Sequence, residues 1–563
     1  MRRSLAPLLV LAALTFVVGL GAPALTDSDE AFYGEAAREM VESGNWLTPY
    51  YNYEPRFQKP ILYYWATAAT FVVTGATEWS ARLWAALSGV ALVFVTAGLA
   101  RRWYDDDTAL LAGAIVATSF GYVALGRMAL PDLPLALAVT ATIACCLVAI
   151  GDRVPRPRRW LVAAAVAAAL GFLTKGPLAV VLPGAVVLPI VMIERRASRL
   201  RPVDVVVAAA VFVVVAAPWY LAMWATHGSA YMQSFFVGDN LERFATDRFN
   251  EPRAWWYYGP VVVGGVAPWA PFLLLGLGSS VRVLTGRGGP GSLETRLVIW
   301  MLMPLVIFTL SVGKQPRYVL PLLPPIAMLL AHAIVERTQA RRGLDGGLYR
   351  QQPDRGLQAA SMASGAILVV AAALVWRARP LFVDIPVWHS LAATGVVAFA
   401  GLAVVVVAAA RAWRRAPWAL ACASAVAMPA LVLGALGGGP DDPVHRVARA
   451  VLDARHASEP VGVSRVFVRN LIFYTGVKQT DLITDEQLTA FLSQSGQALV
   501  VVPADVLERV EAAGAPRATR LAEFPYLNQA GLRLRSFLWP EPAHDVQRVL
   551  VVRTSGTGPA PRP

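Results

Sequence analysis

Carboxylates gather just after the first apolar run of this sequence, where they would meet a membrane surface. Residues 27–40 read DSDEAFYGEAAREM and place three carboxylates within four residues. Asp29 and Glu30 are the candidate catalytic acids, because the helix that follows would lie along the bilayer and hold Asp29 near a lipid phosphate. A structural alternative is that Asp27 caps this helix with Glu30 as its capping-box partner.

The few lysines of the chain point to an anionic ligand. Of 50 Lys and Arg residues only four are Lys, and Lys59, Lys175 and Lys314 each precede a proline at or near the end of an apolar run. One such lysine is readily explained by snorkelling toward headgroups. Three on one face favour a shared anionic ligand such as a lipid-linked phosphate, to which Arg243 and Arg317 would add bidentate contacts.

Other polar residues are predicted at the same level. Ionisable groups beside phosphate-binding cations indicate acid/base chemistry next to a bound anion. The candidate substrate-binding residues are Tyr33, Tyr63, Arg127, Asp132, Glu242 and Tyr318. The three cysteines all lie inside apolar runs, so they predict neither a disulfide framework nor a zinc site.

The composition predicts a polytopic membrane protein. Of 563 residues, 56% are hydrophobic and 15% charged, which leaves too little polar surface for a soluble domain of this size. The net charge of +13 suggests nucleic acid at first sight. In a membrane protein, however, an Arg excess is expected in cytoplasmic loops, so no nucleic-acid partner is predicted.

Thirteen apolar runs approach the roughly 20 residues that a membrane-spanning helix needs. Placing the N-terminus in the cytoplasm makes every inner loop basic, as the positive-inside rule requires. The apolar run 61–73 would reverse that pattern if it crossed, so it is predicted to be interfacial or re-entrant; the first run could alternatively be a cleaved signal peptide. The predicted spans are 5–25, 83–100, 108–126, 128–150, 160–173, 178–193, 205–224, 256–277, 297–312, 319–335, 359–376, 387–410 and 417–436.

The composition changes near residue 437. Residues 464–468, 498–502 and 549–552 are short β-like runs, whereas 485–492 and 504–513 favour helices. The predicted organisation is a membrane domain over 1–436 with a first outer loop over 26–82, and a small extracytoplasmic α/β domain over 437–553. A disordered tail is expected over 554–563.

Several motifs together resemble the first outer loop and later loops of the aminoarabinose lipid A transferases. That family belongs to the protein O-mannosyltransferase-like superfamily of integral-membrane glycosyltransferases with the GT-C fold. The matches cover about the first 340 residues in the family's order. They are residues 29–40, GNWLTP at 44–49, FQKPILYYW at 57–65, LTKGP at 173–177, PWY at 218–220, NLERF at 240–244, WYY at 256–258, PW at 268–269 and KQPRYVLP at 314–321.

The resemblance implies transfer of a sugar from a polyprenyl-phosphate carrier to an extracytoplasmic lipid, glycan or protein acceptor, in the bacterial inner membrane. It maps the family's catalytic aspartate onto Asp29, and the lysines that bind the carrier phosphate region onto Lys59 and, on a weaker match, onto Lys175 and Lys314. Two positions depart from the family pattern. Phe32 stands where those enzymes usually have Arg, and Gln58 stands where they have a metal-associated Glu, which argues against a metal and against aminoarabinose as the donor sugar.

Two other classes remain open at this point. A transporter or flippase for lipid-linked sugars would also need an amphiphilic cavity with phosphate-binding cations, but alternating-access sites lie near the midplane of the bilayer. A non-catalytic assembly factor that binds partners through the C-terminal domain would leave the clustered ionisable residues unexplained.

Overall fold

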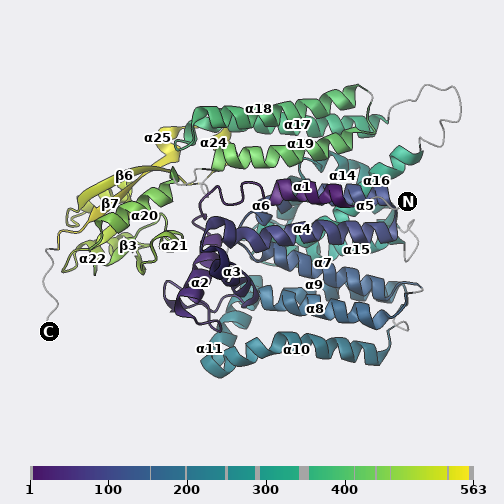
Figure 1. Ribbon diagram of the computed structural model, residues 1–563, viewed down its shortest axis with the longest axis horizontal. Coiled ribbons are helices and arrows are strands. Elements are labelled where there is room, and N and C mark those ends of the chain that lie inside the picture. The colour runs from purple at the N-terminus through teal and green to yellow at the C-terminus, as the bar shows by residue number, and fades with distance from the viewer. Residues whose placement is uncertain are drawn as a thin grey trace.

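The computed structural model consists of a bundle of long helices with a small α/β unit at one end (Figure 1). It describes residues 4–152, 154–196, 200–246, 252–285, 292–340, 354–410, 412–437, 441–456, 458–528 and 532–556. The first residues of the chain, predicted to be cytoplasmic, lie outside the described residues, as does the predicted tail from residue 557 onward.

The bundle is built by the helices of the first 436 residues. These are α1 (Ala6–Phe16), α2 (Asp29–Ser43), α3 (Leu62–Thr74), α4 (Glu78–Trp103), α5 (Asp106–Thr118), α6 (Phe120–Gly126), α7 (Asp132–Ala149), α8 (Pro157–Lys175), α9 (Leu178–Ile193), α10 (Pro202–His227), α11 (Ser229–Met232), η2 (Gln233–Glu242), α12 (Arg243–Ala245), η3 (Trp255–Tyr257), α13 (Tyr258–Val266), η4 (Ala270–Phe272), α14 (Leu273–Leu284), α15 (Leu293–Leu310), η5 (Pro316–Leu322), α16 (Leu323–Ala340), α17 (Arg355–Ala378), η6 (Arg379–Leu381), α18 (Val387–Ala409), α19 (Ala416–Leu431) and η7 (Val432–Leu436). A two-stranded hairpin, β1 (Tyr50–Tyr51) and β2 (Glu54–Pro55), follows α2.

The helices bear out a multi-pass membrane protein. In the described part of the chain, eight helices are long and apolar enough to cross a membrane, and two bent pairs, α5–α6 and α13–α14, bring this to ten. Helices α1 and α9 are apolar but shorter. Each of the thirteen predicted spans overlaps a helix or a bent pair, although α1 covers only residues 6–16 of the predicted span 5–25, and their number as membrane crossings stays a prediction. Helix α3 has 13 residues, fewer than a span needs.

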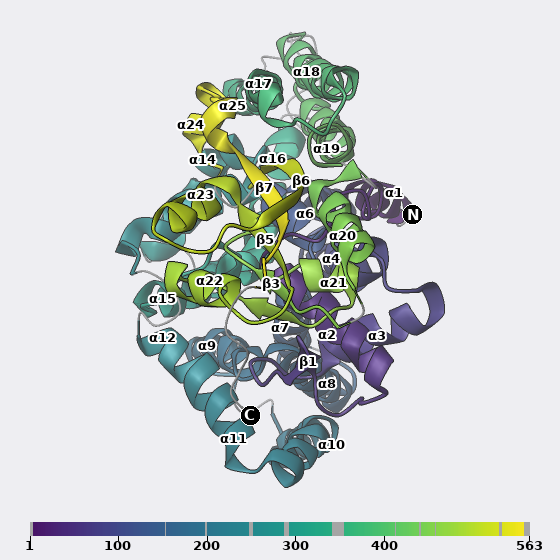
Figure 2. The ribbon, with the colours of Figure 1, turned by 90° about the vertical axis from the view of Figure 1, so that its left-hand side faces the viewer.

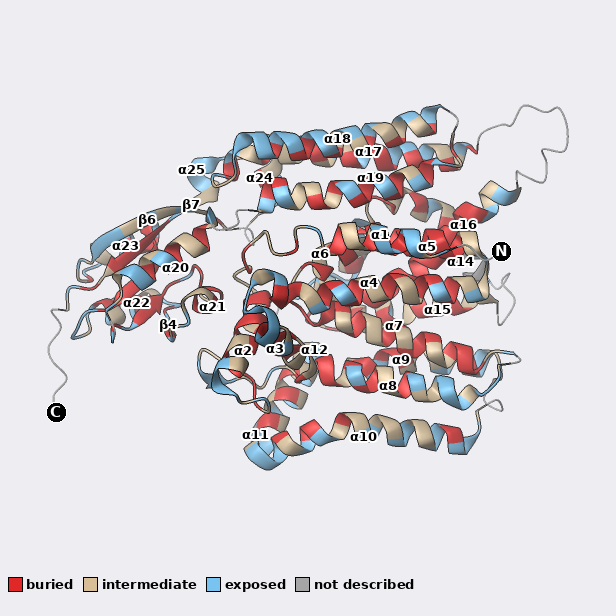
Figure 3. Ribbon diagram, in the orientation of Figure 1, coloured by how far each residue is buried: buried red, intermediate tan, exposed pale blue. Residues whose placement is uncertain are grey.

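Burial separates central helices from peripheral ones. Figure 3 shows mostly buried residues along α5 and many exposed ones along α10 and α18. In the most apolar 18-residue stretch of Pro316–Gln339, which contains most of α16, 89% of the residues are buried. In the corresponding stretch of α10 only 17% are buried. Because the exposed residues of α10 and α18 are largely apolar, those faces are the ones that lipid would cover.

Helix α2 begins one residue later than the sequence suggested. Ser28 is its N-cap and accepts a hydrogen bond from the backbone N–H of Glu30, so the prediction that Asp27 caps the helix was wrong. The Asp27 carboxylate instead accepts from the backbone N–H of Arg469, 2.7 Å away, in the C-terminal part of the chain. Gly44 ends the helix with φ +68°, a left-handed conformation that glycine adopts without strain.

The C-terminal unit is a five-stranded mixed sheet covered on both faces. The strand order is β4-β3-β5-β7-β6; β4 and β5 run parallel to β3, and β7 is antiparallel to both β5 and β6. Its elements are α20 (Pro443–Ala454), β3 (Val461–Val463), α21 (Leu471–Thr475), β4 (Gln479–Asp481), α22 (Asp485–Leu492), β5 (Leu499–Pro503), α23 (Ala504–Ala512), β6 (Thr519–Leu527), α24 (Leu534–Leu538), α25 (Pro542–Asp545) and β7 (Val546–Arg553).

Alternate residues of the central strand enter different cores. Leu499 and Val501 of β5 pack with α20 and α21, whereas Val500 and Val502 pack with α22 and α23. The predicted strand at 464–468 is wrong: the strand ends at Val463, and residues with positive φ follow. In Figure 2 the sheet and its helices lie in front of the bundle end.

Candidate functional site

Charged residues from six separate elements meet at the end of the bundle that faces the α/β unit. Asp29 opens α2, Asp132 opens α7 and Lys175 closes α8. The others come from the loop before α3, from the π-helical stretch η2 with its continuation α12, and from η5; they are Lys59, Asp239, Arg243, Arg317 and Tyr318. The end of a helix is where an ionisable residue leaves the apolar interior, so these termini can form a polar site.

Arg317 joins two of the carboxylates. Its guanidinium donates a hydrogen bond to Asp29, and its Nε lies 3.6 Å from Asp132. Asp132 also receives a hydrogen bond from the Lys175 ammonium at 2.5 Å. The Lys175 ammonium lies 5.5 Å from the centre of the Tyr318 ring, a cation–π arrangement.

Asp239 joins the other two cations. It accepts a hydrogen bond from Lys59 through one oxygen and from Arg243, at 2.6 Å, through the other. Arg243 follows Asp239 by one helical turn and also donates to the Tyr318 hydroxyl, which links this pair to the Asp132 side. Four cations thus face three carboxylates, and with all seven groups ionised the cluster would carry one net positive charge. Its members are Lys59, Lys175, Arg243 and Arg317 with Asp29, Asp132 and Asp239.

The cluster perturbs the acid–base behaviour of its members. Burial opposes ionisation of Asp29, but the neighbouring Arg317 outweighs it and lowers the pKa of Asp29 to about 2. Burial lowers the pKa of the Lys59 ammonium well below its usual value, and Arg243 and Lys175 add to that shift. An anion bound between these cations would therefore relieve their mutual repulsion.

An apolar cavity opens beside Asp29 and Arg317. It measures about 690 Å³, and Arg469 of the α/β unit joins those two residues at its polar end. Apart from Ser28 and Gln315, the rest of its lining is apolar and comes mainly from α6, α13, η5 and the start of α16, including Phe120, Leu125, Pro260, Val261, Val262 and Leu323. A long hydrocarbon chain with a charged headgroup matches this combination of surfaces.

Glu30 is a structural residue and does not belong to the cluster. Its fully buried carboxylate pairs with Arg82 at 2.7 Å and accepts from the backbone N–H groups of Thr26 and Ala129. Arg82 in turn donates to three backbone carbonyls of the α1–α2 linker. Both oxygens of Glu30 have partners and Glu30 does not line the cavity, so its predicted catalytic role stays a prediction without support from its position.

Three other predicted site residues also serve packing. Arg127 donates to the backbone carbonyl of Thr15 at 2.8 Å, and Tyr63 donates to that of Ala81 at 3.2 Å. Lys314 is buried and donates to the carbonyl of Ser311 at 2.6 Å. The local sequence pattern predicted that all three residues lie near helix ends. It did not indicate that their side chains donate hydrogen bonds to backbone carbonyls.

Tyr33 and Glu242 lie at the margins of the cluster. The Tyr33 ring is buried against Tyr63 and Tyr64, with centroids 5.5 Å apart in each case. Glu242 ends the π-helical stretch and lines a small polar cavity together with Gln58 and Asp239. Their predicted roles in substrate binding stay predictions.

Two arginines that sequence reasoning did not assign also approach the site. The Arg56 guanidinium lies 4.1 Å from the centre of the Phe32 ring, and that of Arg469 lies 5.3 Å from it. Arg469 also acts on the charge of Asp29. Arg56 directly precedes the FQKPILYYW motif at 57–65, whereas no local signal marks Arg469, which follows Asp29 by 440 positions.

The residues around Gln58 do not fit a metal ion. The cavity they line, about 480 Å³, has Asp239 and Glu242 as its carboxylates, and Asp239 already binds two cationic side chains. Within the described ranges, no three His, Cys, Asp or Glu side chains are placed to hold a metal. No step of a mechanism is therefore assigned to a metal here.

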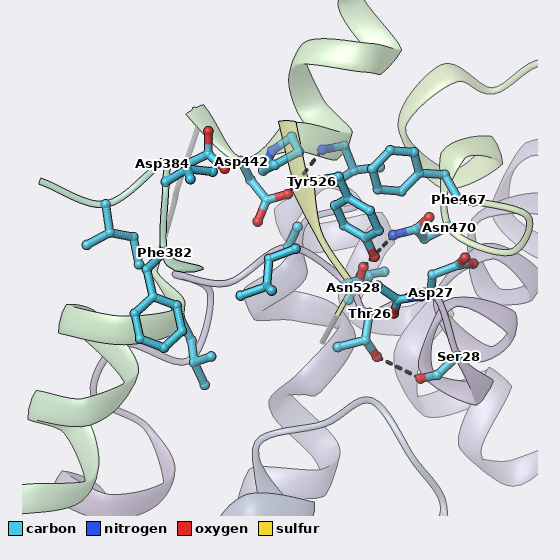
Figure 4. A pocket seen from close by; sticks show the side chains of 18 of the residues that line it. Thr26, Asp27, Ser28, Phe382, Asp384, Asp442, Phe467, Asn470, Tyr526 and Asn528 are labelled. Atoms are coloured by element: carbon cyan, nitrogen blue, oxygen red, sulfur yellow. Dashed lines mark hydrogen bonds between the residues drawn. The ribbon is translucent and has the colours of Figure 1, made fainter. Parts of the chain in front are cut away.

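A separate cavity of about 290 Å³ lies where the α/β unit meets the bundle (Figure 4). Burial raises the pKa of its three carboxyls, those of Asp27, Asp384 and Asp442. Asp442 caps α20, Asp384 pairs with Arg446, and Asp27 binds the Arg469 N–H. The contacts of Asp384 and Asp27 join the unit to the bundle, so the cavity belongs to the interface between these two parts.

The chain is similar to known membrane glycosyltransferases. Residues 7–230 match the family model described as dolichyl-phosphate-mannose-protein mannosyltransferase. The undecaprenyl phosphate-α-4-amino-4-deoxy-L-arabinose arabinosyl transferase 2 of Pseudomonas fluorescens Pf-5 is 33% identical over 346 residues, which is 61% of this chain and 58% of that protein. This chain thus spans less than two thirds of the length of that relative.

Two further similarities extend over more of the chain. Transferase 1 of the same strain is 31% identical over 392 residues, 68% of each chain. The crystal structure of ArnT from Cupriavidus metallidurans, bound to undecaprenyl phosphate, superposes with a TM-score of 0.75 over 99% of both chains at 21% identity, which shows the same fold. The chain therefore belongs to the family of the undecaprenyl phosphate-aminoarabinose arabinosyl transferases, which have the GT-C fold.

Proposed function

We propose that this protein transfers a sugar from a polyprenyl-phosphate carrier to an acceptor outside the cytoplasm. The observation that carries this proposal is a cluster of four cations and three carboxylates, two members of which, Asp29 and Arg317, line an apolar cavity. The names of the relatives, which specify an undecaprenyl-phosphate-linked sugar, support the same donor class.

Donor binding exchanges ion-pair partners within the cluster. In the structure, the carboxylates of Asp29, Asp132 and Asp239 occupy the cations that a phosphate would need. A phosphate bound to Lys59 and Arg243 takes over those contacts and places its sugar toward Asp29. As Arg317 turns to the phosphate, Asp29 loses the partner that lowers its pKa and becomes a stronger base.

The chemistry is one displacement at the anomeric carbon. An acceptor oxygen attacks that carbon while the bond to the phosphate oxygen breaks, and the polyprenyl phosphate leaves with the electron pair. The cations stabilise the charge that develops on this leaving group. A hydroxyl acceptor gives its proton to Asp29, a general-base contribution typically worth about 10²–10⁴-fold; a phosphate acceptor has no proton to give, and Asp29 then orients the sugar.

The position of the cluster favours an enzyme over a transporter. Its members lie at one end of the bundle, at the termini of α2, α7 and α8, whereas alternating-access sites lie near the midplane. An assembly factor would have no use for a cation-lined cavity with an apolar extension. Both alternatives predict that purified protein leaves a lipid-linked sugar intact.

The proposal leaves the identity of the donor sugar to be determined by assay. In the relatives' names the sugar is 4-amino-4-deoxy-L-arabinose, a pentose. Phe32 contacts two arginines near Asp29, and Gln58 lines the polar cavity beside Asp239, so these two residues would shape the sugar pocket. Assays with pentosyl and hexosyl donors on the same carrier will show which sugar this chain accepts, and whether the acceptor is lipid, glycan or protein.

The same proposal orients the protein in the bacterial inner membrane. The site and the α/β domain from residue 437 onward face the outside, and the N-terminus faces the cytoplasm. Basic residues at the other end of the bundle, among them Arg101 in the last turn of α4 and Arg158 in the first turn of α8, support this orientation. Ile483→Cys should react with a membrane-impermeant thiol reagent supplied from the periplasmic side and not from the cytoplasmic side.

The central experiment is Asp29→Asn in proteoliposomes supplied with a labelled polyprenyl-phosphate sugar. With a hydroxyl acceptor, turnover should fall by at least about 10²-fold, the lower end of a general-base contribution, while the gel-filtration elution volume and the thermal stability stay those of the wild type. Asp485→Asn, in an exposed ion pair of the α/β unit, is the matched control. Near-normal turnover of the Asp29→Asn variant would end the assignment of Asp29, whereas a wild type that consumes no donor would end the transferase proposal.

A further inference from the structure

A short helix of the α/β unit exposes an apolar surface beside the bundle. Helix α24 leaves Leu534 64% exposed and Leu538 37% exposed, and Trp539, which ends it, is 63% exposed. On its other side, Phe537 packs into a small core with residues that follow α17, among them Leu381 and Phe382. Two leucines and a tryptophan facing water together would be unfavourable, because each keeps a large apolar area hydrated.

The surface of α24 continues a surface that lipid already covers. Helix α24 contacts α17, and Figures 1 and 2 both place it beside the end of that helix. Along its length α17 exposes apolar side chains at regular helical spacing, including Met362, Ile367 and Val370. Because α17 belongs to a candidate membrane span, Arg355–Leu381, this stripe faces acyl chains, and α24 lies where the stripe reaches the bilayer surface.

Cations and aromatic rings surround the same point. Arg533 and Arg535 flank the exposed Leu534. Arg535 lies 3.4 Å from Glu541 in an exposed ion pair, which restrains the arginine side chain only weakly. The Arg379 guanidinium lies 4.2 Å from the centre of the Trp376 ring, and Trp388 at the start of α18 is 65% exposed. Tryptophan and arginine together at the ends of spans are typical of the headgroup region.

We propose that residues 532–539 lie in the headgroup region of the bilayer and anchor the α/β unit to it. Leu534, Leu538 and Trp539 insert among the upper acyl segments, and Arg533 and Arg535 bind the phosphates of anionic lipids. This second attachment holds the unit at a constant angle over the bundle, beside its seam with α2. The proposal requires only that the protein spans a membrane, and it stands independently of the transferase proposal.

Fluorophores at defined positions test this placement. Cys145, Cys146 and Cys422 are first replaced by Ala or Ser, and single cysteines are introduced as Leu534→Cys, Leu538→Cys and, as the control, Ile483→Cys. Ile483 is equally exposed, at 66%, and precedes α22, which Figure 1 shows at the opposite end of the unit. Each protein carries an environment-sensitive label and is reconstituted, one copy per nanodisc, in phosphatidylcholine with and without phosphatidylglycerol.

The expected result is a shift to shorter emission wavelength at 534 and 538, with quenching by lipids spin-labelled near the headgroup that exceeds quenching by lipids labelled deep in the chain. The label at 483 should show neither effect. Arg533→Gln with Arg535→Gln should remove the gain from phosphatidylglycerol. Equal quenching at 534 and 483 would overturn the proposal, and so would protection of 534 that appears only when two copies share a nanodisc.

Discussion

At the scale of single residues, the decisive feature is that the cations of the site are occupied by carboxylates of the same chain. Lys59 binds Asp239, Lys175 binds Asp132, and Arg317 binds Asp29. In each pair, the attraction between the two charges compensates for part of the hydration that both lose in this partly buried site. A phosphate then binds by exchange of partners, because each cation already has a carboxylate that it can release.

Lys59 should act mainly on the donor. Lys59→Ala removes one charged hydrogen bond to the donor phosphate, worth about 1.5–3 kcal/mol, and should lower kcat/KM for the donor by about 10–100-fold. The KM for the acceptor should change little. Initial rates measured over a grid of donor and acceptor concentrations separate the two effects.

Lys314→Ala is the matched control for that experiment, since Lys314 donates to the Ser311 carbonyl and contacts none of the three carboxylates. A donor defect in Lys314→Ala as large as that in Lys59→Ala would show that the phosphate lies nearer to η5. A larger effect of Lys59→Ala on the acceptor would place the phosphate elsewhere.

At the scale of elements, α2 is held by buried charges on its inner side. Glu30 and Arg82 form an ion pair with side-chain exposures of 0% and 3% that joins α2, α4 and the linker after α1. This pair gives a structural reason for an acid next to Asp29. The linker thereby fixes the direction in which α2 leaves the bundle, and with it the position of Asp29.

Glu30→Ala should therefore act on stability. It leaves the Arg82 guanidinium buried without its carboxylate, which costs about 3–5 kcal/mol, and the thermal unfolding temperature in detergent should fall markedly. Asp29→Asn should leave that temperature almost unchanged. If the Glu30→Gln variant were as stable as the wild type and still lost turnover, that result would support a catalytic role for Glu30.

A second acid of α2 should make stability depend on pH. Burial, together with the charge of Glu35, raises the pKa of Glu39 to about 8, and Glu39 accepts a hydrogen bond from the Tyr53 N–H. Between the unfolded value near 4.5 and about 8, the folded state therefore holds a proton that the unfolded state has lost. Stability from this group is full below pH 4.5 and decreases as the pH rises through that window.

Glu39→Gln, which cannot ionise, should remove that decrease. The variant should be more stable than the wild type at pH 8 by more than about 1 kcal/mol, the equivalent of one pKa unit, and close to it at pH 5. Thermal unfolding across pH 5–8 measures this difference, with Glu42→Gln as an exposed control on the same helix. Parallel curves for wild type and Glu39→Gln would contradict the assignment.

At the scale of the whole molecule, the site is completed by a residue from the far end of the chain. Arg469 lines the apolar cavity with Asp29 and Arg317 and contacts Phe32. Its backbone N–H binds Asp27, so the same segment both fastens the α/β unit and brings a cation to the site. The unit is thus part of the site and is not an appended module.

Arg469→Ala should lower turnover by about 10-fold or more, as expected for loss of one charged contact near the substrate, and should leave folding intact because its backbone contact remains. Lys478→Ala is the matched control, since Lys478 forms an exposed pair with Glu54 in the same unit. Unchanged turnover in Arg469→Ala, measured in the proteoliposome assay, would remove Arg469 from the site.

The apolar runs and helix-end motifs were sufficient to predict much of this protein. Each predicted span overlaps a helix or bent pair, and α22 has the predicted bounds. Seven of the predicted site residues meet in one cluster; they are Asp29, Asp132, Lys59, Lys175, Arg243, Arg317 and Tyr318. Runs of apolar residues specify spans because the bilayer imposes their length and polarity on every helix separately. Ionisable residues at the ends of such runs are then brought to the same level.

Only the tertiary structure decided which charges pair and which turn away. Glu30, Arg127 and Lys314 stand at helix ends as the site residues do, yet their partners are an arginine of another helix and backbone carbonyls. Arg469 enters the site through the packing of the α/β unit against α2. A side chain's partner depends on the direction in which separate elements approach one another, and that direction follows from long-range packing, which no local pattern of residues contains.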